Sequence, residues 1–348
     1  MQQPPQPQQP QQQAQPQPQP QPPQQVEQLV SPTPFLAPPT LTAQDIIVDG
    51  RFKLLSYLGG GSFGQVFKAL DLRTQQPLAL KLENRRDNDR MTSEYRMTEA
   101  LDRCHGFPRV LYYYAKVDDF RVLGLELLGP SLGDLRRYCG GSFSVKTTLM
   151  IAIQLLARLQ HMHKNCHLVH RDLKPENFLM GIGRRGHMVY LTDMGLSQAK
   201  FVAPNDPMHY RVVVEPGLVG TPHWASLAAH RLHAQTYRDD LESLGYILLE
   251  FVLGGLPWSN PQPVDGLTPA QRRVHLKQLT TPQQLCQGAP DCFRQYFDYV
   301  TTQLAYNDVP DYKRLIKMFK KEFWDRRYQF DNVYDWTRRR YAEFRVVD

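Results

Sequence analysis

The sequence predicts an α+β protein of two lobes, in which a small antiparallel sheet precedes a larger, mainly helical part. Three observations lead to this prediction. At 348 residues the chain is long enough for two lobes that each bury a core. Runs rich in β-branched and aromatic residues recur between residues 51 and 127, with turn residues between them. From residue 145 onward, apolar residues recur at helical spacing instead.

The first 45 residues differ in composition from the rest of the chain. Residues 1–25 are almost entirely Gln and Pro, which build no apolar core and interrupt helices and sheets. We therefore expect a disordered arm and linker over residues 1–45 and a folded domain over residues 46–348, with lobes over about residues 46–128 and about residues 129–348. A few apolar residues leave open whether the arm docks on an unknown partner, although a plain tail is the simpler interpretation.

The charge balance limits the classes of partner. The net charge is +7, and since residues 1–45 hold two acidic and no basic residues, residues 46–348 carry +9. This balance favours acidic peptides or phosphates. The positive charge is dispersed and accompanies no nucleic-acid-binding signature, so no specific nucleic acid is predicted. We find no leader-like start and no run of about 18 apolar residues, so we expect no membrane span and an intracellular protein, cytoplasmic or nuclear.

The five cysteines include no C-x-x-C pair, which argues against a disulfide framework and a zinc knuckle. One cluster of metal-ligand types remains, because His161, His163, Cys166 and His167 lie close together in the sequence. We favour the alternative that these residues end an amphipathic helix. Nothing in the sequence indicates an oligomer, so a monomer is the default expectation.

The first folded segment predicts a strand, a glycine-rich loop and a second strand. Residues 51–58 and 66–71 have strand character, and residues 58–66 between them read L-G-G-G-S-F-G-Q-V. Glycines let backbone N–H groups approach phosphate oxygens without a Cβ clash. A dinucleotide-binding fingerprint would continue into a helix, whereas a third strand follows here at residues 78–82. The order of elements therefore favours a glycine-rich hairpin, which resembles the phosphate-covering hairpin of protein kinases.

The remaining elements follow in order along the chain. Residues 90–101 have helical spacing, strands over residues 109–116 and 120–127 complete the sheet, and Gly129–Pro130 breaks the last strand. Ser144 is a suitable N-cap for a core helix that we expect over the next 19 residues.

Two later segments complete the helical lobe. A helix that we expect to begin at Asp240 is apolar on nearly all sides, which indicates burial. Residues 313–345 combine basic and aromatic residues on a helical pattern. We favour a last packed helix there over a helix that binds nucleic acid or membrane.

The segment L-V-H-R-D-L-K-P-E-N, residues 168–177, concentrates polar groups between the apolar anchors Val169 and Leu173 and beyond them. Burying these polar groups as filler would cost several kcal/mol unless each were paired. We therefore expect an accessible loop that displays functional groups. Asn177 of this loop and the later Asp193 offer the amide and carboxylate oxygens that Mg²⁺ prefers.

The pattern H-R-D-x-K-x-x-N in this loop resembles the catalytic loop of eukaryotic protein kinases. The resemblance implies that Asp172 accepts or orients the proton of an attacking hydroxyl and that Lys174 lies near the transferred phosphoryl group. It also implies that Asn177 and Asp193, the latter in L-T-D-M-G, bind Mg²⁺.

Lys81, in L-A-L-K, occupies the place of the lysine that holds the nucleotide phosphates in this family while paired with a helix carboxylate. Glu94 is the preferred partner, because it lies near the start of the predicted helix. Glu99 is the alternative, and both glutamates also fit the simpler interpretation of solvated helix charges.

Several more specific motifs resemble casein kinase I and its tau-tubulin-kinase-like relatives. These motifs are E-L-L-G-P-S-L, N-F-L-M-G, R-D-D-L-E-S-L-G-Y, G-L-P-W, and G-T-P-H-W-A-S in place of the usual A-P-E ending. P-D-Y and D-W near the end are similar to the tau-tubulin kinase branch, and the choice between branches stays open. The resemblance covers residues from about 50 to about 340.

The resemblance implies a two-lobed protein kinase fold that binds ATP and Mg²⁺ and transfers the γ-phosphoryl group to Ser or Thr hydroxyls of protein substrates. It places Leu125 beside the adenine as gatekeeper, the backbone of Glu126 and Leu128 at the adenine edge, and Leu179 beneath the base. The implied ATP-binding residues are Leu58, Gly59, Gly60, Gly61, Ser62, Phe63, Gly64, Gln65, Val66, Ala79, Lys81, Leu125, Glu126, Leu128 and Leu179.

Two further roles are implied by the same resemblance. Thr221 is expected to bond with Asp172 and Lys174, a feature associated with Ser/Thr rather than Tyr substrates. Asp240 is expected to hold the backbone of the catalytic loop as a buried acceptor, and so to be structural.

Two positions depart from the family pattern. Met194 replaces the phenylalanine of D-F-G, and a flexible methionine specifies one conformation less firmly. This supports the alternative of a catalytically weak pseudokinase that acts as a scaffold or interaction module. His223 stands where casein kinase I has a phosphate-binding arginine, and histidine is neutral near pH 7 unless paired. A preference for acidic or primed (pre-phosphorylated) sites is therefore open, with Arg171 and Arg211 as candidates to compensate.

Overall fold

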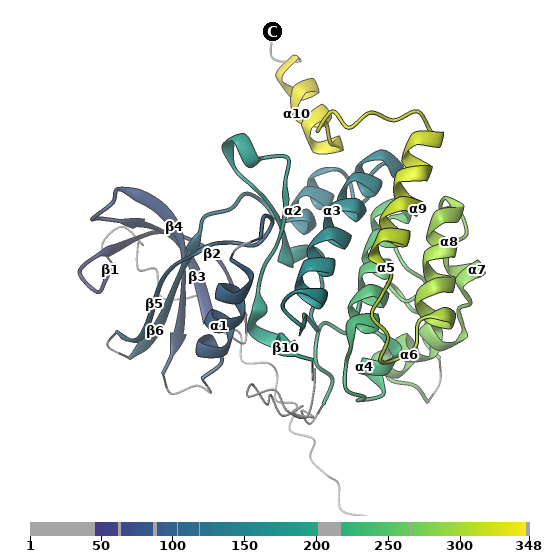
Figure 1. Cartoon of the computed structure of the whole chain (residues 1–348), viewed down its shortest axis with the longest axis horizontal. Helices are drawn as coiled ribbons and strands as arrows, with labels where there is room; N and C mark the ends of the chain where they lie inside the picture. The colour runs from purple at the N-terminus through teal and green to yellow at the C-terminus, as the bar shows by residue number, and fades with distance from the viewer. Residues whose placement is uncertain are drawn as a thin grey trace, which may run out of the picture. The chain divides into compact units, whose positions relative to one another are not determined.

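The computed structural model describes residues 46–345 except residues 62–63, 86–88, 103, 118, 201–216 and 265. The described chain begins with an antiparallel sheet and one helix and continues into a larger, mainly helical lobe (Figure 1). The two-lobed α+β class predicted from the sequence is therefore confirmed. The predictions for the arm over residues 1–45, and for Ser62, Phe63 and Arg211, lie outside the described residues.

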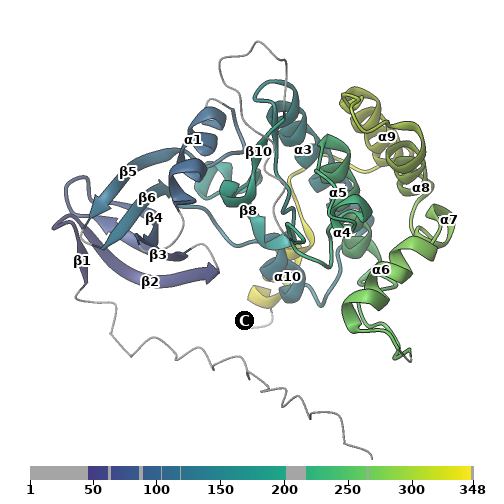
Figure 2. The same ribbon diagram turned by 90° about the horizontal axis from the view of Figure 1, so that it is seen from below.

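The first lobe is a six-stranded antiparallel sheet in the order β1-β2-β3-β4-β6-β5. Its strands are β1 (Ile47–Val48), β2 (Phe52–Gly61), β3 (Gly64–Asp71), β4 (Gln76–Asn84), β5 (Val110–Val117) and β6 (Phe120–Glu126). Helix α1 (Met91–Leu101) packs against β5 and β6 and lies next to the helical lobe (Figure 2).

Strands β2 and β3 extend further into the glycine-rich segment than the sequence predicted. Their pairing continues to Gly61 opposite Gly64, whereas the predicted strands stopped at Leu58 and Val66. Gly64 has a φ of +118°, and a Cβ there would clash with the carbonyl oxygen of Leu82. Glycine has a low strand propensity, so side-chain patterns do not predict the pairing of β2 with β3 at the glycines, which depends on backbone hydrogen bonds.

The two faces of this sheet have different roles. Side chains alternate along a strand, so the residues on either side of Ala79 face away from Ala79 and Lys81. That opposite face forms a small core of Phe52, Leu54, Ala69, Leu78, Leu80, Val117 and Val122. On the other face, the register pairs Lys81 with Val66 and Ala79 with Leu125. Four of the predicted nucleotide-binding residues therefore share one side of the sheet.

The second lobe consists mainly of helices. They are α2 (Leu132–Tyr138), α3 (Val145–Lys164), α4 (Leu227–His230), α5 (Tyr237–Leu253), α6 (Pro269–Leu279), α7 (Pro282–Leu285), α8 (Asp291–Asp298), α9 (Tyr312–Asp325) and α10 (Asp335–Arg345). Two short antiparallel pairs join β7 (Leu168–Val169) to β10 (Gln198–Ala199) and β8 (Phe178–Met180) to β9 (Val189–Leu191).

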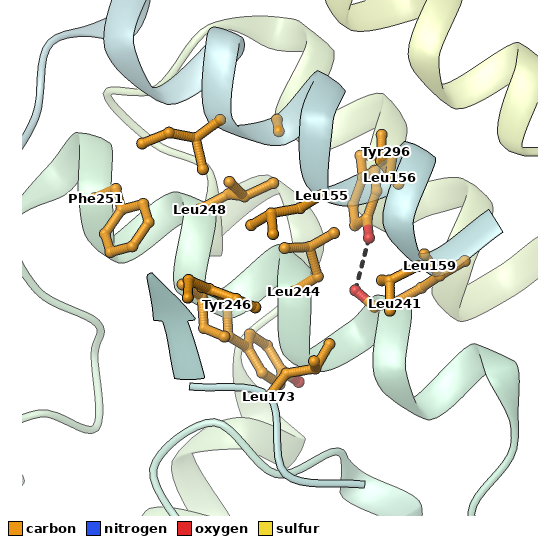
Figure 3. Close-up of a cluster of buried hydrophobic side chains, with 14 of the residues drawn as sticks. Leu155, Leu156, Leu159, Leu173, Leu241, Leu244, Tyr246, Leu248, Phe251 and Tyr296 are labelled. Atoms are coloured by element: carbon orange, nitrogen blue, oxygen red, sulfur yellow. Dashed lines mark hydrogen bonds between the residues drawn. The ribbon is translucent and has the colours of Figure 1, made fainter. Parts of the chain in front are cut away.

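Helices α3 and α5 lie at the centre of a large core. Ser144 caps α3 by accepting a hydrogen bond from Thr147 N at 3.2 Å. Helix α5 begins three residues before the predicted Asp240, because Thr236 and Asp239 form a capping box that starts it earlier. Figure 3 shows leucines of α3 and α5 packed together with Leu173, which anchors the predicted catalytic loop in this core.

The basic-aromatic tail forms two helices rather than one. Helix α9 buries Tyr312, Leu315, Phe319 and Phe323 on one side and exposes its lysines, together with Trp324, elsewhere, which agrees with the packed-helix interpretation. Helix α10 packs Trp336 against Phe143, with ring centroids 5.3 Å apart. Among the described residues, no helix is both long and apolar enough to cross a membrane.

Candidate active site

A buried ion pair connects the sheet to α1. Lys81 of β4 is 8% exposed, and its Nζ donates to Glu94 Oε2 at 2.6 Å. The same Nζ lies 3.6 Å from Asp193 Oδ1. Glu99, the alternative partner, instead accepts a hydrogen bond from the hydroxyl of Tyr95 at 2.7 Å. Lys81 therefore links the sheet to α1 through Glu94 and to the second lobe through Asp193.

The surroundings of Lys81 favour its charged form. Burial alone would lower the pKa of Lys81, but the carboxylates of Glu94 and Asp193 outweigh burial and raise it above its usual value. Burial would likewise raise the pKa of Asp193, but Lys81 and Lys174 lower it. A charged lysine and a charged carboxylate therefore lie side by side, where phosphates and a divalent cation would need them.

The loop that carries Asp172 is held by Asp240 of α5. Asp240 Oδ2 accepts from the backbone N–H of His170 at 2.7 Å, and Oδ1 accepts from the backbone N–H of Arg171 at 2.9 Å. His163 Nε2 lies 2.8 Å from Asp240 Oδ2. Burial would raise the pKa of Asp240, but the hydrogen bond with His163 lowers it.

The same bonds stabilise an unusual backbone turn. Arg171 has a φ of +69°, in the left-handed region, which costs about 1–3 kcal/mol for a residue other than glycine. The bond to Asp240 offsets part of that cost. Arg171 Nε also donates to Leu196 O at 2.7 Å, and Nη1 donates to Gln198 Oε1 at 2.8 Å. The guanidinium that was a candidate for phosphate binding therefore already has partners within the protein.

Asp172 is oriented by two donors. Thr221 Oγ1 donates to its Oδ1, and Lys174 Nζ donates to its Oδ2, both at 2.6 Å. The backbone N–H of Asp172 donates to His170 Nδ1 at 3.2 Å. Because Nδ1 accepts, His170 carries its proton on Nε2, which lies 3.1 Å from Thr192 O. Asp172 is only 6% exposed, and the two side-chain donors fix the orientation of its carboxylate.

Asn177 and Asp193 form a donor set that suits Mg²⁺. Asn177 Nδ2 donates to Asp172 O at 2.9 Å, which assigns the amide orientation and leaves the side-chain oxygen available to a cation. The backbone carbonyl of Asn177 accepts from both N and Oγ1 of Thr192 at 3.0 Å, so Asn177 is bonded to the residue that precedes Asp193. Mg²⁺ commonly takes one or two protein oxygens and completes its shell with phosphates and water, so these residues fit it.

The alternative metal cluster at the end of α3 is not assembled. Among the described residues, no group of three His, Cys, Asp or Glu side chains could hold a metal ion. His163 instead contacts Asp240 and the hydroxyl of Tyr312, and His161 Nε2 lies 3.6 Å from Cys166 Sγ. His161 and His163 lie in the last turn of α3 and Cys166 lies just after it, which agrees with the interpretation as a helix end.

The segment after β6 contains the residues expected at the adenine edge. The backbone N–H of Glu126 donates to Arg109 O at 2.9 Å, so this N–H is already used. Within the described chain, the backbone N–H and carbonyl of Leu128 have no hydrogen-bond partner, although Leu128 is half-buried. Partly buried backbone N–H and carbonyl groups usually have a hydrogen-bond partner. Those of Leu128 are therefore available to bond the edge of a base. Leu125 is half-buried opposite Ala79.

The remaining predicted nucleotide contacts lie on β2, β3 and β8. Leu179 is half-buried, whereas its neighbours Phe178 and Met180 are buried, so it points away from the core of the second lobe. Leu58 is 51% exposed, and Val66 is half-buried. The described members of the glycine hairpin are Gly59, Gly60, Gly61, Gly64 and Gln65.

The methionine of D-M-G fits without leaving a polar group unpaired. Met194 is 2% exposed, and its sulfur accepts a hydrogen bond from Ser197 Oγ at 3.4 Å. Thr98, the polar residue of α1 nearby, donates from Oγ1 to Glu94 O at 2.7 Å. The ion pair of Glu94 with Lys81 is formed with this methionine in place.

The segment that begins at Gly220 meets the catalytic loop. A Cβ on Gly220 would clash with Arg171 O, and Gly220 has a φ of +102°. His223 Nε2 lies 3.3 Å from Glu250 Oε1, and Trp224 Nε1 donates to Glu250 Oε2 at 2.7 Å. The residue at the expected phosphate position is therefore already paired with a carboxylate.

Sequence reasoning missed three residues around the site. It assigned no role to His170, although the H-R-D motif contains it. Glu250 was also missed, and the signal that could have found it was an acidic residue within the otherwise uncharged second half of α5. Lys277 lies on the polar helix α6, where no local pattern distinguishes it from a solvated lysine.

Residues 52–316, well over half of the chain, match the family model of the protein kinase domain. The match includes strands β2 to β6 of the sheet, α1, the loop around Asp172 and the helices of the second lobe up to the first part of α9.

Proposed function

Because the chain belongs to the protein kinase family, we propose that it transfers the γ-phosphoryl group of ATP to Ser or Thr hydroxyls of protein substrates. One observation carries this proposal. The structure brings Lys81 within reach of Asp193 across the two lobes, while Asp172 bonds to Lys174 and Thr221 on the neighbouring loop. Lysines, carboxylates and a hydroxyl far apart in the sequence therefore converge on one site.

Asp172 is the group that would receive the substrate hydroxyl. Its carboxylate oxygens each accept one strong hydrogen bond, which fixes their direction and leaves further lone pairs for the attacking hydroxyl. A base held in this way contributes by positioning the nucleophile as much as by accepting a proton.

Lys81 and Lys174 would supply the positive charge. Lys81 is fixed by Glu94 and would contact the phosphates of ATP, and Lys174 is fixed by Asp172 and would lie next to the place of transfer. Charge that is already oriented stabilises a developing negative charge without reorganisation. Asn177 and Asp193 would hold Mg²⁺, which when bound supplies further charge neutralisation at the phosphates.

The adenine would lie between the sheet and the second lobe. Leu128 offers a backbone N–H and carbonyl, Ala79 and Val66 offer apolar contact from the sheet, and Leu179 offers it from β8. A flat apolar slot with a few fixed backbone groups is the usual form of a nucleobase site.

We also place the chain in the casein kinase I superfamily. In most kinases the segment after the magnesium motif ends in A-P-E, whereas in this chain it ends at Ser226. Ser226 caps α4 and donates to Asp239 Oδ1 at 2.6 Å. The contact between Thr221 and Asp172 supports Ser/Thr specificity. Glu250 argues against strong dependence on a primed substrate, because the ring of His223 is already paired with its carboxylate, which Arg136 Nη1 also contacts at 3.3 Å.

The second candidate function is a pseudokinase that acts as a scaffold, and Met194 in place of phenylalanine is the observation that favours it. The two candidates predict different outcomes when wild-type protein and D172N are incubated with Mg-ATP and Ser, Thr and Tyr peptides. An active kinase phosphorylates Ser and Thr peptides, and D172N does not. A scaffold gives the same background signal with both proteins, which would refute the proposal.

A further inference from the structure

Lys277 of α6 is a buried lysine that contacts the segment next to Thr221. It is 3% exposed, whereas lysine is almost never fully buried without partners. Its Nζ donates to Ala225 O at 2.6 Å and to Pro222 O at 3.2 Å. These two carbonyls belong to residues 220–227, which we call the substrate loop. A helix about fifty residues further along the chain therefore reaches back to this loop.

Two aromatic rings complete the surroundings of Lys277. Nζ lies 4.9 Å from the ring centroid of Tyr246 and 5.1 Å from that of Trp258. Such rings stabilise an ammonium group that has lost its water. Trp258 also donates from Nε1 to His223 O at 2.9 Å. Lys277 and Trp258 together thus bind the carbonyls of Pro222, His223 and Ala225.

The hydrogen bonds of Lys277 do not require its charge. Burial lowers its pKa to about 7, and a neutral amine still has two N–H groups for two carbonyls. His230 Nε2 lies 3.4 Å from Nζ and 3.1 Å from Pro222 O, so it carries a hydrogen and also donates to that carbonyl. The donors therefore hold the same two positions whether or not Lys277 is protonated.

The substrate loop is fixed to the catalytic loop at its other end. Thr221 bonds to Asp172, and Gly220 packs against Arg171 O. The residues after Thr221 directly follow a residue that bonds to Asp172, so their placement bears on a substrate chain whose hydroxyl would meet Asp172. Lys277 holds the carbonyls of Pro222 and Ala225 from α6, alongside the bond of Trp258 to His223 O and the bond of Trp224 to Glu250.

We propose that Lys277 is a positioning residue that fixes the substrate loop through the carbonyls of Pro222 and Ala225 and so sets the affinity for the protein substrate. The proposal rests on the proposed kinase function, since it concerns the substrate of that reaction. It does not make Lys277 a catalytic residue, because Lys277 touches neither Asp172 nor Lys81 in the described structure.

The test compares K277M, which keeps the length of the side chain but has no donor, with K277R, which keeps donors. K317M is the matched control, because Lys317 is an exposed lysine of α9. The peptide KM, the ATP KM and kcat are measured for each, together with hydrogen exchange of residues 217–230. We expect K277M to raise the peptide KM by about tenfold, which corresponds to about 1.4 kcal/mol, with the ATP KM unchanged.

We also expect faster exchange in the substrate loop of K277M, unchanged exchange in α5, partial rescue by K277R, and wild-type behaviour of K317M. If K277M does not fold, K277Q, which keeps an amide donor and fills less space, takes its place with the same readouts. Wild-type exchange and peptide KM in the Lys277 variant would overturn the proposal, as would equal rises in both KM values. A wild-type protein without kinase activity would refute the proposed function, and the exchange comparison would still test Lys277.

Discussion

The two lobes hold their parts of the site in different ways. In the second lobe, Asp172 and Asn177 lie on a loop whose backbone is bonded by the buried Asp240 and whose Leu173 is part of the large core. In the first lobe, Lys81 lies on a sheet with a small core and is oriented mainly by its ion pair with Glu94. The difference indicates that the catalytic loop is fixed by packing, whereas the lysine depends on the position of α1.

Helix α1 connects these two regions. Its first half carries Glu94, and its last residue, Leu101, belongs to the core of the second lobe. It also packs against the turn that contains Met194. A change at this helix would therefore alter the position of Lys81 without disturbing Asp172, and the predictions below test that asymmetry.

The largest effect is expected for D172N. Replacing the carboxylate removes the base and one acceptor but keeps the shape, so kcat is expected to fall by about 10²–10⁴-fold. The ATP KM should change little, because Asp172 bonds to Lys174 and Thr221 and to no predicted adenine contact. Steady-state kinetics would show this, with D325N on exposed α9 as the control. A kcat within a factor of two of the wild type would contradict the assignment.

The next effect concerns the stability of the second lobe. D240A would leave the N–H groups of His170 and Arg171 and the ring of His163 without their buried acceptor. The free energy of unfolding should fall by about 3–5 kcal/mol, as for removal of one partner of a buried charged network. Urea denaturation would measure it. A loss below about 1 kcal/mol would mean that the loop is held by other contacts.

A smaller loss of stability is expected for E94Q in the first lobe. Lys81 would lose the negative charge of its closest partner, although the glutamine oxygen can still accept a hydrogen bond, and it would keep Asp193 at 3.6 Å. The free energy of unfolding should therefore fall by only about 1–3 kcal/mol. Phosphoryl transfer should fall as well, because the contact that orients Lys81 is weakened. E99Q is the matched control on the exposed side of α1. If E94Q and D240A cost the same stability, the contrast between the lobes would be wrong.

The smallest effect is a pH dependence at His230. Burial lowers its pKa to about 4, below the value near 6.5 that it has when unfolded. Between these values the unfolded chain binds a proton that the folded chain does not, so stability falls as the pH falls from about 6.5 to about 4. H230Q should reduce this slope in urea denaturation at pH 7 and pH 5, with H275N as the control. An unchanged slope in H230Q would exclude His230 as its source.

The pattern of the loop around Asp172 could be recognised from the sequence because its information is local. The spacing of Asp172, Lys174 and Asn177 lies within a few residues, and the position of Glu94 follows from one helix and one strand. Strand ends within the glycine hairpin were misplaced, because backbone pairing there depends on few side chains. The start of α5 was misplaced because a cap at Thr236 was overlooked.

Contacts between distant segments could not be predicted where one of the partners is a backbone group. Lys277 binds the carbonyls of Pro222 and Ala225, and any residue at those positions offers the same acceptor. The pairing of His223 with Glu250 likewise depends on how the substrate loop packs against α5. Such contacts follow from the packing of the lobe, so only the structure identifies them.

The most direct test of the account is a double-mutant cycle between the two lobes. Peptide phosphorylation from γ-labelled ATP is measured for wild type, K81M, D172N and the double variant. If Lys81 and Asp172 act on one reacting group, the double variant should be about as inactive as the worse single variant, since residues that act as a unit are strongly non-additive. Effects of K81M and D172N that multiply, or a wild-type protein that transfers no phosphate, would contradict the account.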